Sequence, residues 1–80
     1  MRVVAEFTIE PFVEGDPGPH VHAGWDAARA AGFEPVMEAF GSTIEGPQAE
    51  VVAAVHALLD AALDAGATRV SLQLRSISPS

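Results

Sequence analysis

The sequence contains no cysteine, which excludes both a disulfide framework and a zinc site built on thiolates. Aromatic residues are also few, with one tryptophan, four phenylalanines and no tyrosine among 80 residues. Hydrophobic residues make up 49% of the chain, but many of them are alanines, which bury little area each. A core of this kind is thin in so short a chain, so we expect self-association to a dimer or tetramer.

Basic residues and long apolar runs are equally scarce. Four basic residues stand against 11 acidic ones, which gives a net charge of -7. Nucleic acids and anionic membranes bind clustered lysine and arginine, so neither is an expected partner, whereas neutral or cationic small molecules are. No stretch approaches the roughly 20 apolar residues that cross a bilayer, and Glu6 interrupts the position where a signal peptide would be apolar. We therefore expect a cytoplasmic protein.

The hydrophobic pattern changes between a period of two and a helical period along the chain. Apolar and polar side chains alternate cleanly over residues 2–10, as in a half-buried strand. The predicted elements are strands at residues 2–10, 33–40, 42–45 and 68–77 and helices at residues 19–31 and 47–65.

The resulting order is β-α-β-β-α-β, which is typical of the ferredoxin-like sandwich. The expected fold class is therefore α+β, with two helices on one face of a four-stranded antiparallel sheet. Right-handed crossovers place the first and third strands side by side in the middle of this sheet. We expect one domain over residues 1–80, with residues 76–80 as a frayed tail.

The most informative stretch is the glycine-bracketed segment at residues 41–46, Gly-Ser-Thr-Ile-Glu-Gly. A short strand that presents Ser42, Thr43 and Glu45 between two points of backbone freedom suits a small polar ligand. The same residues also fit plain turn chemistry, with Glu45 stabilising the start of the following helix. Likewise, the carboxylates of the other strands, such as Glu6, fit either a binding site or a solvated sheet face.

Three segments resemble the small thiamine-binding (hydroxymethylpyrimidine-binding) protein family, formerly a domain of unknown function. They are Val-Ala-Glu-Phe-Thr-Ile at residues 4–9 with Pro11 following, the segment 41–46, and Gly-Ala-Thr-Arg-Val-Ser at residues 66–71. The spacing agrees from about Val3 to Ile77. The resemblance implies a ferredoxin-like fold that assembles as dimers or dimers of dimers. It also implies binding of thiamine or its pyrimidine without chemistry, hence no catalytic residue, no metal and no cofactor besides the ligand.

Individual site residues follow from the same resemblance. Ser42 matches the family's hydroxyl after the first glycine, Glu45 its carboxylate before the second, and Glu6 and Thr8 its polar positions on the first strand. With Thr43, these residues form the expected ligand-binding set. An aminopyrimidine offers ring nitrogens and an exocyclic amine, with which carboxylates and hydroxyls can pair.

The start of the first helix departs from the family, which places serines where this chain has His20 and His22. Two histidines at a loop-to-helix junction, without an identifiable third ligand, do not predict a metal site. They do keep open a second function, a small dimeric ferredoxin-like enzyme of isomerase or monooxygenase type with His20 or His22 as general base. A third candidate is an amino-acid-binding regulatory module. Trp25 is expected in the core, with stacking on a heterocycle as the alternative.

Overall fold

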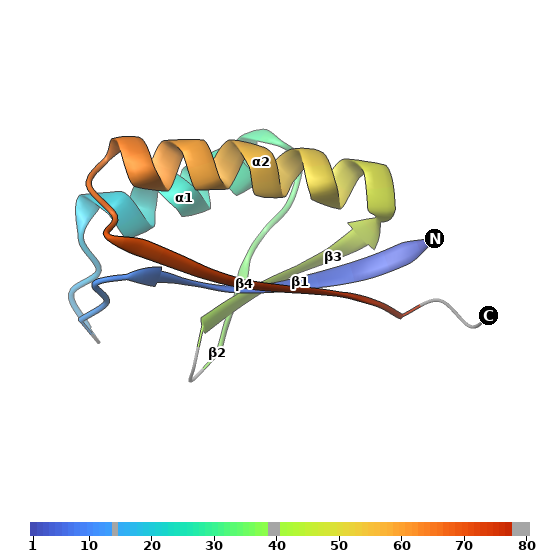
Figure 1. Cartoon of the computed structure of the whole chain (residues 1–80), viewed down its shortest axis with the longest axis horizontal. Helices are drawn as coiled ribbons and strands as arrows, with labels where there is room; N and C mark the ends of the chain where they lie inside the picture. Colours follow the sequence, from blue (N-terminus) through green and yellow to red (C-terminus); the bar gives the residue numbers. More distant parts are fainter. Residues whose placement is uncertain (14, 39–40, 78–80) are drawn as a thin grey trace.

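The protein is described by a computed structural model that covers residues 1–13, 15–38 and 41–77. Its elements are β1 (Arg2–Glu10), α1 (Pro19–Ala30), β2 (Val36–Glu38), β3 (Gly41–Pro47), α2 (Gln48–Asp64) and β4 (Arg69–Ser76). The strands form one antiparallel sheet in the order β2-β3-β1-β4, and both helices cover the same face (Figure 1). This arrangement confirms the ferredoxin-like α+β fold, with β1 and β3 in the middle of the sheet.

The hydrophobic core lies between the helices and the face of the sheet that they cover. The central strand β1 supplies four buried side chains in strict alternation, Val3, Ala5, Phe7 and Ile9. β3 adds Ile44, and the helices contribute Val21, Trp25, Ala28, Val51, Ala54, Val55, Leu58 and Ala62. Four of the fully buried positions are alanines, so the core is as thin as the composition predicts.

The element bounds differ from the prediction mainly around β2 and β3. β2 begins only at Val36, because Pro35 has no N–H for a ladder and Phe33 still donates its N–H to Ala28 O at the end of α1. The remainder of the predicted strand, residues 39–40, lies outside the described residues. β3 is longer than predicted, since its pairing with β1 continues as far as Arg2 opposite Pro47.

The first two residues of the predicted tail at residues 76–80 pair with β1 in the structure. Ser76 belongs to β4, and Ile77 donates its N–H to Arg2 O at 3.0 Å. These two residues are therefore tied to β1, and residues 78–80 lie outside the described part. Within the described ranges, neither helix is long and apolar enough to span a membrane.

Candidate functional site

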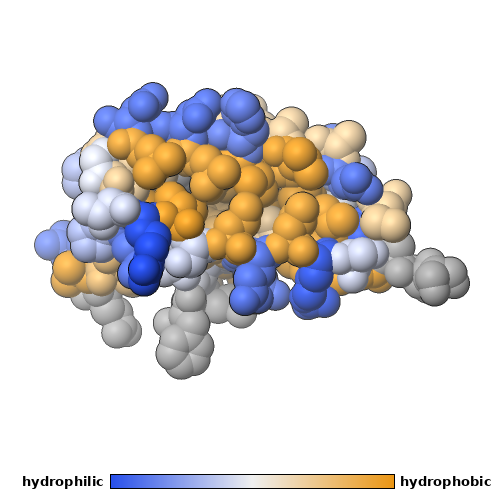
Figure 2. All heavy atoms as spheres, in the orientation of Figure 1, coloured by the Kyte–Doolittle hydropathy of each residue, from blue (hydrophilic) through white to orange (hydrophobic). Residues whose placement is uncertain are grey.

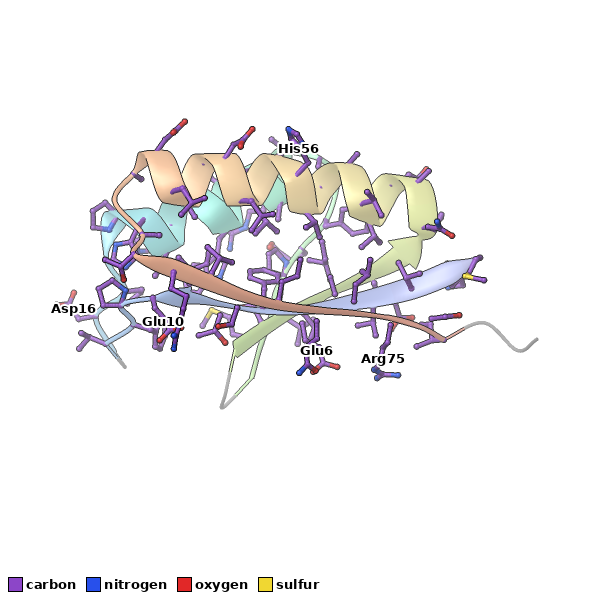
Figure 3. The ribbon with its side chains drawn as sticks, in the orientation of Figure 1. Glu6, Glu10, Asp16, His56 and Arg75 are labelled. Carbon is purple, nitrogen blue, oxygen red and sulfur yellow. The ribbon has the colours of Figure 1, made fainter. Side chains whose placement is uncertain are left out.

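The five predicted ligand-binding residues divide between the two faces of the sheet. Ser42 points toward the helices and is buried, as are Ile44 and Gly46 on the same strand. The other four residues lie on the opposite face, which no helix covers among the described residues; we call this the open face. Figure 3 shows Glu6 there, pointing away from both helices. A small ligand on the open face can therefore contact only four of the five, Glu6, Thr8, Thr43 and Glu45, which we call the open-face cluster.

The pairing of β1 with β3 brings the members of this cluster together. Glu6 stands directly opposite Thr43, and Glu45 stands opposite Val4, two residues along β1 from Glu6. Side chains directly opposite each other in an antiparallel pair have Cβ atoms about 4.5–5.5 Å apart. The carboxylate of Glu6 and the hydroxyl of Thr43 can thus face one group of a bound molecule.

Gly41 leaves the space that the Thr8 side chain uses. A Cβ atom at position 41 would lie 2.9 Å from Thr8 Oγ1 and 2.7 Å from the carbonyl oxygen of Phe7. The φ angle of Gly41 is also +148°, a conformation that side-chain-bearing residues rarely adopt. The first glycine of the segment therefore allows β3 to approach β1 closely at this end of the cluster.

Each carboxylate of the cluster has an arginine beside it. Arg75 Nε donates to Glu6 Oε1 at 3.3 Å, and Arg2 Nη2 lies 3.6 Å from Glu45 Oε2. All four side chains are about half exposed or more, and ion pairs of this kind contribute only about 0–1 kcal/mol to stability. A cationic ligand could displace either arginine at little cost to the fold.

Val4 provides an apolar surface between the charged residues. It lies on the open face opposite both Glu45 of β3 and Arg75 of β4, yet only 7% of it is exposed. The aliphatic parts of long charged side chains can cover apolar surface in this way. A flat ring that displaced the arginine side chains would meet Val4 as an apolar floor.

Glu10 forms a separate contact at the far end of the open face. It accepts hydrogen bonds from Arg69 Nε at 2.9 Å and from Ser71 Oγ at 3.4 Å, both on β4. The hydrogen bond from Arg69 lowers the pKa of the Glu10 carboxyl and raises the pKa of Arg69. Glu10 therefore ties β4 to β1 and is not part of the cluster.

Ser42 has a structural partner on the helix side. Trp25 Nε1 donates to Ser42 Oγ at 3.1 Å, and both residues are buried, with 6% of each exposed. Trp25 is a core residue, as predicted, and its indole joins α1 to β3. Sequence reasoning overlooked this pair, although the strand alternation places Ser42 on the helix side beside the buried stripe of α1.

The three histidines make unrelated local contacts. His20 Nε2 lies 2.5 Å from Pro11 O, so its tautomer with a proton on Nε2 can donate to that carbonyl. His22 meets the Trp25 ring edge-on, with 5.5 Å between ring centroids. His56 lies on the outer surface of α2 beside Asp60 (Figure 3). Across the described ranges, no three His, Asp or Glu side chains gather as metal ligands would.

The start of α2 gives no support to a capping role for Glu45. Its N-cap residue is Pro47, and no side chain of the described structure caps it. Instead, the N–H of Gln48 donates to the backbone oxygen of Met1 at 2.8 Å. Glu45 points to the open face and pairs with Arg2.

Comparison with protein families places the chain in one of them. The model of the family described as thiamine-binding protein matches residues 5–77. The chain belongs to the thiamine-binding protein family. The match includes β1 from Ala5 onward, all of β3 and therefore every residue of the open-face cluster. No curated protein matches the sequence significantly.

Several solved structures share the fold of this family member. A protein from Thermotoga maritima, whose proposed role is thiamine biosynthesis or salvage, is 22% identical with a TM-score of 0.65; the alignment covers 94% of this chain and 81% of that one. A domain of unknown function from Bacillus cereus is 23% identical with a TM-score of 0.67, covering 92% and 72%. A Streptococcus pneumoniae protein is 17% identical with a TM-score of 0.73, covering 99% and 89%. At these identities the likeness establishes the fold.

Proposed function

We propose that this family member is a non-catalytic binding protein for thiamine or its hydroxymethylpyrimidine moiety. The observation that carries the proposal is the family match over residues 5–77, which spans the whole open-face cluster. We further propose that the ligand lies on the open face against Glu6, Thr8, Thr43 and Glu45. Ser42 then supports the site from behind, through its hydrogen bond with Trp25.

The chemistry of the cluster suits both parts of thiamine. The aminopyrimidine carries an amine that donates and ring nitrogens that accept, so it can pair with Glu6 and with the hydroxyls of Thr8 and Thr43. The thiazolium is a cation without an N–H, which Glu45 can stabilise by charge attraction in place of Arg2. The net charge of -7 also favours the approach of a cation over that of an anion.

The arrangement of the histidines gives an enzymatic function no specific support. A general base must lie within hydrogen-bonding reach of the proton that it removes. His20 is held by the Pro11 carbonyl and His22 packs on Trp25, which belongs to the helix side of the sheet. A ligand on the open face would therefore be separated from the His22 ring by the sheet, and the printed contact of His20 lies at Pro11, beyond the end of β1. Binding without turnover remains our proposal for this site.

Calorimetric titration with thiamine, and separately with hydroxymethylpyrimidine, tests this proposal. Replacing Glu45 with glutamine keeps the shape but removes the charge and half of the acceptor capacity. Two unit charges about 4 Å apart attract by roughly 1 kcal/mol in water and by about 4 kcal/mol near a protein surface. Glu45→Gln should therefore weaken thiamine binding roughly ten- to a hundredfold. Hydroxymethylpyrimidine, which lacks the thiazolium cation, should lose less affinity.

The matched control is Glu50→Gln, which makes the same chemical change at an exposed position in the first turn of α2. It should leave the affinity for thiamine unchanged, although it lowers the net negative charge equally. The site assignment fails if Glu45→Gln binds thiamine as tightly as the unmodified protein. The proposed function itself fails if the unmodified protein binds neither compound.

A further inference from the structure

Gln73 of β4 extends the row of polar side chains at the centre of the open face. It stands directly opposite Glu6 of β1, whose other neighbour is Thr43 of β3. Side chains directly opposite each other in an antiparallel pair lie on the same face and can interact. Figure 2 shows this side of the molecule, with hydrophilic atoms below β4 toward the open face and hydrophobic atoms above it toward α2. The polar surface of the open-face cluster therefore continues onto a third strand at Gln73.

The side-chain amide of Gln73 is available to a ligand. The chain contains only two carboxamides, Gln73 and Gln48, and Gln48 belongs to α2 on the other side of the sheet. Gln73 is exposed, and within the described ranges its side-chain amide has no hydrogen-bond partner. Arg75, the other long donor beside Glu6, already pairs with that carboxylate. A ligand can therefore engage the Gln73 amide without breaking a side-chain contact of the fold.

The length of each side chain decides which groups can meet the edge of a bound ring. A ring stacked on Val4 lies about 3.5–4.0 Å above the methyl groups of this residue. A threonine hydroxyl is bonded to Cβ, as the methyl groups of valine are, so the hydroxyls of Thr8 and Thr43 lie near the level of the floor. The end groups of Glu6 and Gln73 are two bonds further from Cβ. These two residues are therefore better placed than the threonines to meet the ring in its own plane.

The edge of an aminopyrimidine presents an amine, which donates, beside a ring nitrogen, which accepts. A carboxylate only accepts, so Glu6 can bind the amine but cannot donate to the nitrogen next to it. A carboxamide carries a donor, and glutamine pairs with the amine and a ring nitrogen of adenine in protein–DNA complexes. We propose that Gln73 is a specificity-determining residue, which donates to this ring nitrogen while Glu6 accepts from the amine; the inference rests on the proposed function.

This assignment also orients the ligand on the open face. Glu45 and Gln73 lie on the two strands that flank β1, so the ligand lies across β1 over Val4. Its pyrimidine points toward β4 and its thiazolium toward Glu45 of β3. Because Gln73 is neutral and binds only the pyrimidine, it contributes equally to the binding of thiamine and of hydroxymethylpyrimidine. Glu45, in contrast, acts on the thiazolium cation.

Titration calorimetry with two related compounds tests the contact between Gln73 and the ring nitrogen. The compounds are hydroxymethylpyrimidine and its pyridine analogue, in which C–H replaces the ring nitrogen beside the amine. Gln73→Met keeps the length of the side chain and removes the amide, so it should weaken binding of hydroxymethylpyrimidine about three- to tenfold. Binding of the analogue should be nearly unchanged by Gln73→Met. Since the same two compounds are compared in both proteins, differences in their charge and hydration cancel.

The matched control is Gln48→Met, the same change at the other glutamine, which is also exposed. It should leave the affinity for both compounds unchanged. If Gln73→Met binds hydroxymethylpyrimidine as tightly as the unmodified protein, or loses equal affinity for both compounds, the role of Gln73 is overturned and the proposed function stands. If the unmodified protein binds neither thiamine nor hydroxymethylpyrimidine, the proposed function fails and this inference fails with it.

Discussion

The hydrogen bond between Trp25 and Ser42 allows the structural role of one predicted site residue to be measured. Both groups are buried, and Ser42 Oγ is the acceptor for the indole N–H at 3.1 Å. Ser42→Ala removes this acceptor and leaves the N–H of Trp25 buried without a partner. If Ser42 acts through Trp25, its replacement should lower stability and leave the intrinsic affinity for thiamine nearly unchanged.

The expected magnitude follows from the cost of an unpaired buried donor. That cost is about 1–3 kcal/mol, whereas removing both partners of a hydrogen bond can be nearly neutral. Ser42→Ala should therefore destabilise the protein by about 1–3 kcal/mol when Trp25 is present. For a domain of this size each kcal/mol lowers the Tm by about 4–8 °C.

The control background is Trp25→Phe, which removes the donor while keeping an aromatic side chain. The cavity left by the smaller ring is common to both proteins that carry this substitution, so it cancels when Ser42→Ala is compared between the two backgrounds. In the Trp25→Phe background, Ser42→Ala should cost less than in the unmodified background by at least about 1 kcal/mol.

Urea denaturation followed by far-ultraviolet circular dichroism can measure all four proteins, including those without the single tryptophan. Protein concentration is kept equal in each experiment, because the stability of a protein that self-associates would depend on it. An equal cost of Ser42→Ala in both backgrounds would refute the coupling. A hundredfold loss of thiamine affinity in a fully folded Ser42→Ala protein would show that Ser42 contacts the ligand.

Two further predictions concern β1 and its neighbours. The lowered pKa of Glu10 means that its contribution to stability is fully present above its ordinary pKa of 4.5 and is lost as the pH falls through the folded-state value. In an NMR titration Glu10 should thus titrate below 4.5, and Arg69→Gln should raise this midpoint; an unchanged midpoint would contradict the assigned cause. Gly24→Ala should destabilise the fold by about 1 kcal/mol, because a Cβ atom there would overlap Ile9 Cδ1, and this overpacking outweighs the gain in helix propensity. Ile9→Val removes that atom, so it should lower the free energy of unfolding less in the Gly24→Ala protein than in the unmodified one. If the effects of the two substitutions simply add, the overlap with Ile9 Cδ1 is not the cause.

Most of the fold could be predicted because local pattern and long-range packing agree along the chain. β1 begins and ends as its alternation indicates, since its apolar face is the centre of the core. The glycines that follow the helices have the positive φ angles that are common at helix C-termini, +94° at Gly32 and +107° at Gly66. The extents of β2 and β3 could not be predicted, because they depend on where pairing with a neighbour stops.

Gly24 illustrates a different limit of sequence reasoning. A glycine inside a helix costs stability relative to alanine, so it predicts that something approaches closely, most simply another backbone. The neighbours are instead the side chains of Ile9 and Ala62. The packing of α1 against β1 and α2 decides which atoms approach Gly24. The sequence pattern within α1 does not contain that information.

The composition of the candidate site could be predicted from the sequence better than its geometry. The glycine-bracketed segment draws attention to Ser42, Thr43 and Glu45 together because they are adjacent in sequence. In a strand, adjacent side chains point to opposite faces, so Ser42 is separated from the other two. The partners Arg2 and Arg75 could not be found by local pattern either, because cross-strand pairing over the length of the chain brings them to the cluster.

The alternation of side chains in β1 and β3 also places the residues expected to affect stability and those proposed to bind ligand on opposite faces of the sheet. On one face, Phe7 and Ser42 pack with the helices, so substitutions there should change the free energy of unfolding. On the other face, Glu6 and Glu45 take part in exposed ion pairs, so their replacement should change ligand affinity with little effect on stability.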